Sequence, residues 1–545
     1  MRNFLTPILL IGAINIGASQ GLITVNDHIG DYARLLEIQG KPINRSIVNT
    51  NNQFEIWTHE EVDADSLGVW SKQLRFYQDR NDKGSNLYLI SPRVDYVYSS
   101  KYSRSYNDGP LWSGKGSTIG LNVGIKGKWG PLTGVFYPNF YHAQNNFFQL
   151  RGGLTRIKDP FNYQLARNID YVQIFGLDPV NEFDLGQSYV SLELGNAIIK
   201  FGTENFWWGP SVLNPIMMSN TGPGFPHLNI GTKKPARTKY GDFEVTSIWG
   251  QLKESDFFRF DANTVSRRFI AGLSLGYRPS FSEFMKGFSI GIGRILQKNW
   301  PDSGLSFGDI FLSLKNTDAN ATVAPNGDFV NDDTDQYISL DARWFFEKSG
   351  AEIYLEWVRN DFWLDFKDLV SEPEHGSVFT VGMQKAFKTN KATWRIGFEN
   401  TSLATTRTRE VRNSGDIYTH TVAIQGYTHR GFLLGAPIGP GSKSQLIRLD
   451  RFDENGKYGF SINRIRFNDN FFFRTFDDFT RHDVEWTFGF EAIRFINNFE
   501  VTGRFNYSRR MNWNYYHNSD VNNFQLITSI KYHLDGKPLL TLFDK

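Results

Sequence analysis

The stretch SYVSLELGNAIIKFG (residues 188–202) decides how this chain folds. In its first run, apolar and polar side chains alternate, as they do in a strand with one apolar face and one wet face. Gly195-Asn196 then separates this run from a second one, and a Gly-Asn pair between two strands is a strong signal for a two-residue β-hairpin. The sequence therefore predicts a hairpin here, and the neighbouring runs indicate how far this pattern extends.

Runs with a period of two continue from residue 87 to the end of the chain, and most contain ten to fourteen residues. The predicted strands are 87–98, 118–129, 132–142, 188–194, 197–202, 241–252, 267–278, 287–297, 306–315, 335–346, 350–363, 376–388, 391–401, 415–427, 444–453, 457–468, 483–496, 498–510 and 521–534. Soluble sheets have shorter strands, of about 5–6 residues, whereas a tilted strand that crosses a membrane needs about 9–11. Strand length therefore favours a membrane β-barrel.

The connections between these runs support the same architecture. Short joints at 130–131, 347–350, 388–391, 453–456 and 496–498 alternate with long ones at 143–187, 203–239, 316–334, 402–414 and 428–443. Short turns on one side and long loops on the other are typical of outer-membrane barrels. We therefore expect an all-β fold, a transmembrane antiparallel β-barrel of about 18 strands. A soluble β-propeller or sandwich is the alternative, but no repeat of blade length is visible.

Composition limits the function. Aromatic residues make up 15% of the 545 residues and Phe alone contributes 47, yet mean hydropathy is −0.40, which indicates apolar residues interleaved with polar ones. The chain has no cysteine, so it has neither disulfides nor a thiol nucleophile. Lys+Arg (59) and Asp+Glu (57) nearly balance, so charge does not suggest nucleic acid as a partner.

The N-terminus has the pattern of an exported protein. Arg2, an apolar run over residues 4–16 and then Gly17-Ala18-Ser19 predict a signal peptide over residues 1–20, cleaved near Ser19 or Gln20. An N-terminal anchor helix is the alternative, but the run is too short to span a bilayer. Residues 21–86 are predicted to form a helical or irregular periplasmic segment, with a helix from Asn26 to Gly40 that Asn26 or Asp27 caps. The barrel is then residues 87–545.

The least repetitive segment is FGTENFWWGPSVLNPIMMSNTGPGFPHLNIGTKKPART (residues 201–238). A hairpin needs only two to five residues to close, so a long aromatic loop is either functional or fills space. Trp207-Trp208 has two interpretations: packing in a plug or belt, or a platform on which flat sugar faces stack beside Glu204, Asn205 and His227. Both interpretations are open at the level of the sequence.

Other loops offer similar residue types. Tyr106-Asn107-Asp108-Gly109 with Trp112 can be a turn or a second sugar platform. Arg359 and Asp361 close a predicted strand and can pair with each other or face water in the lumen. His227, His375 and His429 fall in loop-like contexts, where a polar wall residue is the more common role than a metal ligand.

The chain contains no motif of a serine hydrolase, zinc protease, P-loop enzyme or EF-hand. A pair of carboxylates distant in sequence could still meet in a lumen as in glycosidases, so a hydrolase is one alternative. We predict no catalytic residues, no metal and no cofactor.

Four groups of motifs resemble one known family. FGTENFWWGP, SNTGPGFPHL and GDFEV (201–245), YNDGPLWSGKGSTIGLNVGIKGKWGPLTGVFYP (106–138), EIYLEWVRND with PEHGSVFTVGMQK (352–385), and YTHRGFLLGAPIGPGS (427–442) resemble the capsule assembly Wzi family of outer-membrane proteins in order and spacing. DYARLLEIQG (31–40) looks like the N-terminal segment of that family.

The resemblance implies an 18-stranded barrel with a helical periplasmic piece and a lumen closed by inserted loops. It also implies a lectin-like, non-enzymatic protein without a cofactor that holds capsular polysaccharide at the cell surface. The expected partners are surface polysaccharide and outer-membrane lipid, with a monomeric chain; a porin for small solutes or oligosaccharides is the alternative. The motifs do not fix binding residues, so the candidates are loop aromatics and their polar neighbours: Trp207, Trp208, Asn205, Glu204, His227, Asn107, Asp108, Trp112, Arg359, Asp361 and His429.

Overall fold

The computed structural model describes residues 19–20, 24, 27–41, 46–47, 70, 85–152, 159–163, 165, 168–258, 266–314, 334–360, 370–406, 408, 415–533 and 540–543. Residues 1–18 of the predicted signal peptide and most of the segment 41–86 lie outside these residues. No helix in the described ranges is long and apolar enough to cross a membrane.

The described chain is dominated by strands. They are β1 (Ser19–Gln20), β2 (Ser85–Ser99), β3 (Gly116–Trp129), β4 (Leu132–Phe136), β5 (Asn139–Ala143), β6 (Val180–Asp184), β7 (Tyr189–Leu194), β8 (Ala197–Gly202), β9 (His227–Thr232), β10 (Ala236–Thr238), β11 (Gly241–Lys253), β12 (Arg267–Pro279), β13 (Phe288–Asn299), β14 (Thr334–Phe346), β15 (Ala351–Asn360), β16 (Ser377–Lys388), β17 (Ala392–Ser402), β18 (Thr428–His429), β19 (Phe432–Leu433), β20 (Lys443–Asp453), β21 (Gly456–Arg466), β22 (Val484–Ile496), β23 (Phe499–Met511), β24 (Val521–Tyr532) and β25 (Leu540–Phe543). The helices are α2 (His28–Ile38), η4 (Glu283–Met285), η5 (Phe307–Leu314), α6 (Asp469–Thr475), η8 (Phe479–Arg481) and η9 (Trp513–Tyr515).

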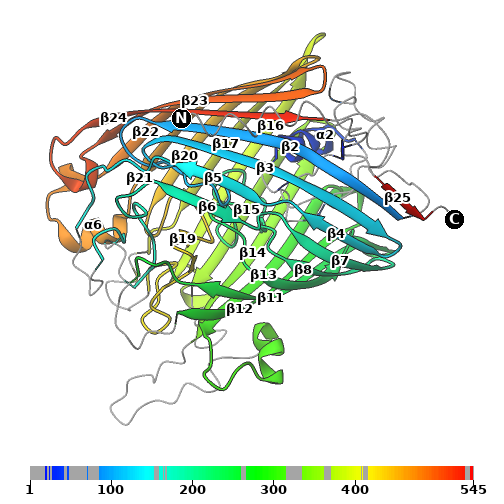
Figure 1. The fold of residues 1–545 in the computed structure, drawn as a ribbon, viewed down its shortest axis with the longest axis horizontal. Helices are drawn as coiled ribbons and strands as arrows, with labels where there is room; N and C mark the ends of the chain where they lie inside the picture. The colour runs from blue at the N-terminus through cyan, green and yellow to red at the C-terminus, as the bar shows by residue number, and fades with distance from the viewer. Residues whose placement is uncertain are drawn as a thin grey trace.

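The strands close into a barrel (Figure 1). Each long strand pairs antiparallel with the next, and β2 pairs with β24 through Arg93↔Lys531 to Ser99↔Gln525, which closes the sheet. The wall contains eighteen strands when β4 with β5, β6 with β7, and β9 with β10 are each counted as one interrupted strand. The prediction of an antiparallel barrel of about 18 strands is confirmed.

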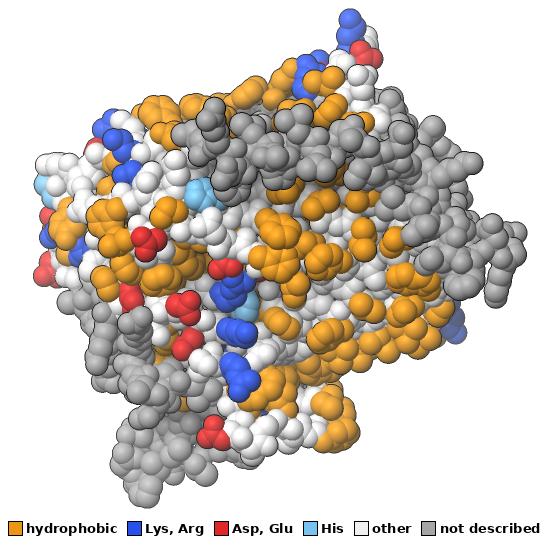
Figure 2. All heavy atoms as spheres, in the orientation of Figure 1, with side chains coloured by type: hydrophobic (Ala, Val, Ile, Leu, Met, Phe, Trp, Pro, Cys, Tyr) orange, Lys and Arg blue, Asp and Glu red, His pale blue; other side chains and the backbone are white. Residues whose placement is uncertain are grey.

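The wall has an apolar exterior, and its inner face carries many polar side chains beside the apolar residues that pack on the lumen core. On β16, the outward side chains are Phe379, Val381 and Met383, whereas Thr380 and Gln384 point inward and are buried. Figure 2 shows the resulting belt of apolar side chains over the strands. In a soluble protein the apolar face of a strand is buried and the polar face is exposed; here the exposed face is apolar. This arrangement is expected of a strand with lipid on its outer side and a lumen on its inner side.

Several local predictions were wrong. The long connection predicted over 143–187 contains the strand β6, which pairs with β5. The strand predicted over 306–315 is contradicted where the structure describes it, because Phe307–Leu314 form the helix η5, and the apolar spacing 307, 310, 311, 314 is helical. Residues 415–427 form turns and bends, because their apolar side chains pack into the lumen core rather than alternate across a wall. Residues 227–238 were placed in a loop but form β9 and β10, in which His227 and Asn229 face inward.

The helix α2 lies in the lumen at the end that carries the short turns. The Asp27 side chain accepts from the Ile29 N–H at 3.1 Å and caps the helix, as predicted. Arg34 pairs with Glu352 at 3.0 Å, and Glu352 is an inward-facing residue of β15 two positions from a short turn. Tyr32 stacks on Trp70 with ring centroids 4.1 Å apart. This end of the barrel is therefore occupied by the N-terminal segment.

Candidate functional site

Residues 203–226, here called the plug loop, leave β8 and enter the lumen. The carboxylate of Glu399 on β17 accepts from the backbone N–H groups of Val212 (2.6 Å), Leu213 (3.1 Å) and Asn214 (3.0 Å). Glu356 on β15 accepts from the N–H groups of residues 216 and 217 at 2.7 and 3.1 Å and from the hydroxyl of residue 211 at 2.6 Å. Two carboxylates of the wall thus satisfy a loop that has no secondary structure to pair its own amides.

Trp207 and Trp208 are packing residues of the plug loop. Their exposed fractions are 0% and 2%. The Trp207 indole donates to the Ser211 carbonyl at 3.0 Å, and Trp208 lies in the apolar core of the lumen beside Met217 and Ile248. Neither ring has a free face on which a sugar could stack, so of the two interpretations left open by the sequence, packing describes this pair.

The base of the plug loop contains a buried cluster of polar side chains, Glu204, Asn205 and His227. The amide of Asn205 accepts from Gln187 at 2.8 Å and donates to the Gly222 carbonyl at 2.8 Å. His227 Nε2 lies 3.6 Å from a Glu204 carboxylate oxygen, and its Nδ1 contacts the Phe225 carbonyl at 2.8 Å. These contacts tie the start of the loop to Gln187, to the end of the loop at Gly222, and to β9 at His227, which is a positioning role.

His429 and Arg359 are also buried. His429 Nδ1 accepts from the Lys253 N–H at 3.1 Å; burial, with nearby Arg430 and Arg268, holds its pKa well below the usual value, so a neutral ring accepts this bond. Arg359 donates to the Glu372 carbonyl at 3.4 Å. Asp361, its predicted partner, lies outside the described residues.

Asn107, Asp108 and Trp112 do line cavities. Asn107 has a left-handed backbone (φ 56°) and donates to the Leu213 carbonyl of the plug loop at 2.9 Å. Asp108 accepts from Ser113 Oγ at 2.8 Å, and burial raises the pKa of its carboxyl. Trp112 is buried, and its indole N–H donates to the Asn145 side chain at 2.9 Å.

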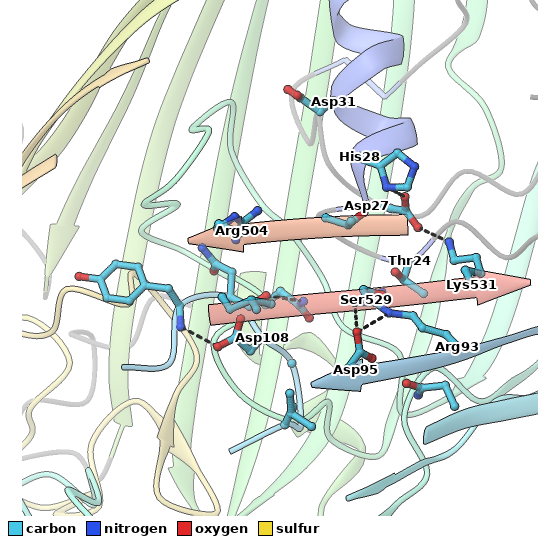
Figure 3. Close-up of a pocket in the computed structure, with 18 of the residues that line it drawn as sticks. Thr24, Asp27, His28, Asp31, Arg93, Asp95, Asp108, Arg504, Ser529 and Lys531 are labelled. Carbon is cyan, nitrogen blue, oxygen red and sulfur yellow. Dashed lines mark hydrogen bonds and ion pairs between the residues drawn. The ribbon is translucent and has the colours of Figure 1, made fainter. Parts of the chain in front are cut away.

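A cavity of about 250 Å³ lies between α2 and the loop 100–115 (Figure 3). Its charged walls are paired: Arg93 with Asp95 at 2.8 Å, and Lys531 with Asp27 at 3.2 Å. Asp27, His28 and Glu500 have the spacing of a metal site. The Lys531 ammonium lies between Asp27 and Glu500, 3.3 Å from the latter, and already supplies the positive charge there, so this cluster does not fit a metal ion.

A second cavity of about 180 Å³ lies against β20–β23, and a third of about 140 Å³, here called the mouth cavity, lies at the long-loop end. Tyr106 lines all three cavities. The mouth cavity is aromatic and amide-rich; its lining includes Tyr102, Tyr106, Trp112, Phe148, Gln149, Tyr163, Tyr171, Gln173, Phe432, Phe467, Arg510, Trp513 and Asn514.

Its polar groups are held in fixed positions. Tyr102 Oη donates to Glu485 at 2.6 Å, and Arg104 donates to the other oxygen of the same carboxylate at 3.1 Å. Arg510 pairs with Asp483 through two bonds of 2.7 and 2.8 Å and covers the Phe467 ring at 4.0 Å. Ordered donors and acceptors beside flat rings are the arrangement that small polar ligands need.

The connection from β23 to β24 supplies Trp513 and Asn514 in an unusual backbone. Asn512, Asn514, Tyr515 and Asn518 all have positive φ, between 50° and 62°. Such left-handed residues cost free energy, particularly at an aromatic position, and persist where surrounding contacts hold them. Here the half-buried Trp513 ring lies 5.6 Å from Tyr102 and 6.4 Å from Phe148, ring centroid to ring centroid.

Sequence reasoning missed most of the mouth cavity. Tyr102, Phe148, Gln149 and Trp513 come from three different long connections, and no local pattern joins them. The run Asn512-Trp-Asn-Tyr-Tyr was a usable signal, because asparagines that tolerate left-handed backbone alternate there with aromatic residues.

The fold and its occupied lumen define a class: an outer-membrane β-barrel whose interior is filled by its own loops and an N-terminal helix. The sequence model of the family described as "Capsule assembly protein Wzi" matches residues 97–527. The chain therefore belongs to the capsule assembly Wzi family, and the resemblance seen in its motifs is confirmed.

A solved structure shows the same fold. This structure is that of Wzi from Escherichia coli, described as an outer membrane protein involved in group 1 capsule assembly and as a carbohydrate-binding β-barrel. It is 13% identical to this chain, the match covers 94% of this chain and 100% of that one, and the TM-score is 0.61. OccAB1 from Acinetobacter baumannii (11% identity, 83% and 99% coverage, TM-score 0.40) and OprD from Pseudomonas aeruginosa (8%, 83% and 95%, 0.37) are more distant. No curated protein matches the sequence.

Proposed function

We propose that this protein is a non-enzymatic, lectin-like receptor that binds capsular polysaccharide at the cell surface and helps to assemble or attach the capsule. The mouth cavity carries this proposal, because it places flat aromatic rings beside fixed amides and charged groups at the barrel end with long loops. That end faces the outside of the cell in outer-membrane barrels. Membership of the Wzi family supports the same function.

The contact residues we propose are the half-buried Trp513 and Phe148 as stacking surfaces, with Gln149 and Asn514 as hydrogen-bonding partners; the Tyr102 ring is buried and packs against Trp513. Gln149 is exposed, and Asn514 is buried with its amide 3.4 Å from the Gln149 carbonyl. Trp112 and Asn107 remain candidates through the rings and loop that they support. Trp207 and Trp208 act indirectly, by keeping the plug loop in place below the cavity.

The test is the binding of capsular polysaccharide, purified from the cell that carries this gene, to the protein in detergent, compared with Trp513→Ala. Loss of one stacking ring is expected to cost about 1 kcal/mol, or about fivefold in Kd. Trp486→Ala is the matched control, since Trp486 lies on the outer face of β22. Equal binding by wild type and Trp513→Ala, with the barrel intact, would exclude this site.

A channel is the second candidate, because an 18-stranded barrel is wide enough for a pore. Three cavities meet at Tyr106, but the plug loop and α2 occupy the lumen on either side. Stable single-channel currents from the wild-type protein in planar bilayers would favour transport over attachment.

We also propose that the chain is exported with residues 1–20 as a cleaved signal peptide, that residues 21–86 face the periplasm, and that the protein is a monomer. N-terminal sequencing of the mature protein tests the cleavage, and its mass in detergent tests the oligomeric state.

A further inference from the structure

The helix η5 (Phe307–Leu314) lies outside the barrel wall. In Figure 1 it is the short green helix beyond β12, and it follows β13 on the long-loop side. On a soluble protein the apolar side of such a helix faces the core, whereas the apolar side of η5 faces outward. Phe307, Ile310, Phe311 and Leu314 form one stripe with exposed fractions of 77%, 45%, 46% and 65%. An exposed apolar stripe of this kind marks an interaction surface.

The buried face of η5 covers charged residues of the wall. Arg294 and Lys298 on β13 point outward, where lipid would otherwise meet them. Lys298 pairs with Asp309 at 2.6 Å, and Arg294 donates to the Ser313 carbonyl at 3.3 Å. The two contacts are four residues apart on both the helix and the strand, so η5 runs back along β13 toward the opposite end of the barrel.

Apolar contacts fix the helix in this position. Leu312 is buried in a cluster with Phe269, Ala271 and Leu296 of β12 and β13, and the Trp249 indole of β11 donates to the Ile310 carbonyl at 2.7 Å. Arg294 is five residues from the end of β13, which is roughly 16 Å along the strand. The helix therefore reaches well down the wall from the loops, into the level of the apolar belt.

The stripe continues that belt. Ile292 on β13 and Leu275 on β12 are exposed on the same outer wall. The helix η5 covers a charged part of the strand surface and turns its own apolar stripe outward. A surface that lipid disfavours is thereby replaced by one that lipid accepts.

We propose that η5 is a lipid-facing element that seats Phe307, Ile310, Phe311 and Leu314 among the acyl chains of the outer leaflet and shields Arg294 and Lys298 from them. The occupant of this surface is lipid, because the stripe is continuous with the belt of the barrel and lies at the end that faces the cell exterior. Aromatic and aliphatic side chains at this depth would also hold the barrel at a fixed height in the membrane.

The absence of cysteine from the chain allows a direct test. A nitroxide label is placed at Ile310→Cys, Phe311→Cys or Leu314→Cys in the full-length protein in phosphatidylcholine/phosphatidylglycerol vesicles. Collision with oxygen, which concentrates in acyl chains, is compared with collision with a water-soluble nickel complex. Ile292→Cys on the belt is the lipid reference, and Glu454→Cys in the exposed β20–β21 turn is the water reference.

The three η5 labels are expected to give the oxygen-to-nickel ratio of Ile292→Cys. The water-type ratio of Glu454→Cys would overturn the proposal. Exclusion of both reagents would also overturn it, and dipolar broadening between labels would then identify a second copy as the occupant. All five positions are exposed, so cysteine there leaves the fold intact, which the heat-dependent shift of the barrel on electrophoresis verifies.

Discussion

The anchoring of the plug loop by Glu399 gives a quantitative prediction for Glu399→Gln. One oxygen of this carboxylate accepts from Leu213 and Asn214, and the other accepts from Val212 at 2.6 Å and from Tyr354 Oη at 2.9 Å. A glutamine amide keeps one acceptor and turns its NH₂ toward the remaining donors. One backbone N–H is then left without an acceptor, and the surviving bonds lose their charge.

An unsatisfied buried N–H costs about 1–3 kcal/mol, and a bond to a charged acceptor is worth about 1 kcal/mol more than a neutral one. The total loss is about 3 kcal/mol, since the Tyr354 hydroxyl can turn to accept from the new NH₂. Opening of the plug loop should therefore become about a hundredfold more frequent. The barrel itself should survive, because its eighteen strands pair without the loop.

Hydrogen exchange followed by mass spectrometry measures this opening directly, through the amides of residues 211–217. These amides should exchange about a hundredfold faster in Glu399→Gln. Glu244→Gln is a matched control: Glu244 on β11 also accepts a backbone N–H, that of Ile47 at 2.6 Å, but not from the plug loop. Exchange over 211–217 that is the same in Glu399→Gln as in wild type would refute the anchoring role of the carboxylate.

Two further predictions concern α2 and the base of the plug loop. His28 lies 3.3 Å from Glu500 and 3.1 Å from Asp27; burial opposes its charge, but Glu500 and Asp27 outweigh burial and raise its pKa. The stabilisation of the folded state by the charged His28 ring is complete below about pH 6.5 and is lost as pH rises through the raised pKa of the ring. Hydrogen exchange of the α2 amides, corrected for the chemical rate, should therefore increase above the raised pKa in wild type. It should not increase in this way in His28→Asn. At Gly224 a Cβ atom would lie 1.8 Å from the Thr203 carbonyl oxygen, so Gly224→Ala should destabilise the plug loop by about 1–3 kcal/mol and lower the melting temperature. At Gly152 no atom lies within 4 Å of the Cβ position, so Gly152→Ala should leave the melting temperature unchanged.

The wall of the barrel could be predicted from sequence because its signal is local. The Gly195-Asn196 hairpin is present as predicted, with Leu194 paired to Ala197, and alternation located most other strands within a few residues. Local signals failed where other contacts decided the structure. Residues 227–232 follow a Pro-rich stretch and were therefore predicted to be part of a loop. They form the strand β9 instead, because they pair with β11, with His227 opposite Gly250.

The site could be predicted only in part, because the lumen is built from contacts between distant residues. Asn107, Asp108 and Trp112 were found through their own loop, and they do line cavities. The bond from Tyr102 to Glu485 spans 383 residues, and that from Val212 to Glu399 spans 187. Trp207 and Trp208 show why the sequence left two interpretations open: their chemistry suits a sugar, but Trp208 is buried by wall residues such as Ile270 and Ile295, which follow later in the chain.

The contacts of Glu356 and Glu399 also constrain the order in which the molecule assembles. The plug loop is synthesised well before β15 and β17, so its amides must remain hydrated until those strands are in place. Contacts of such long range form slowly, because the intervening chain must first be ordered. We therefore expect the lumen to fill last, with water leaving it as the wall closes between β2 and β24, so that final maturation of the interior is a separate and later event than insertion into the membrane.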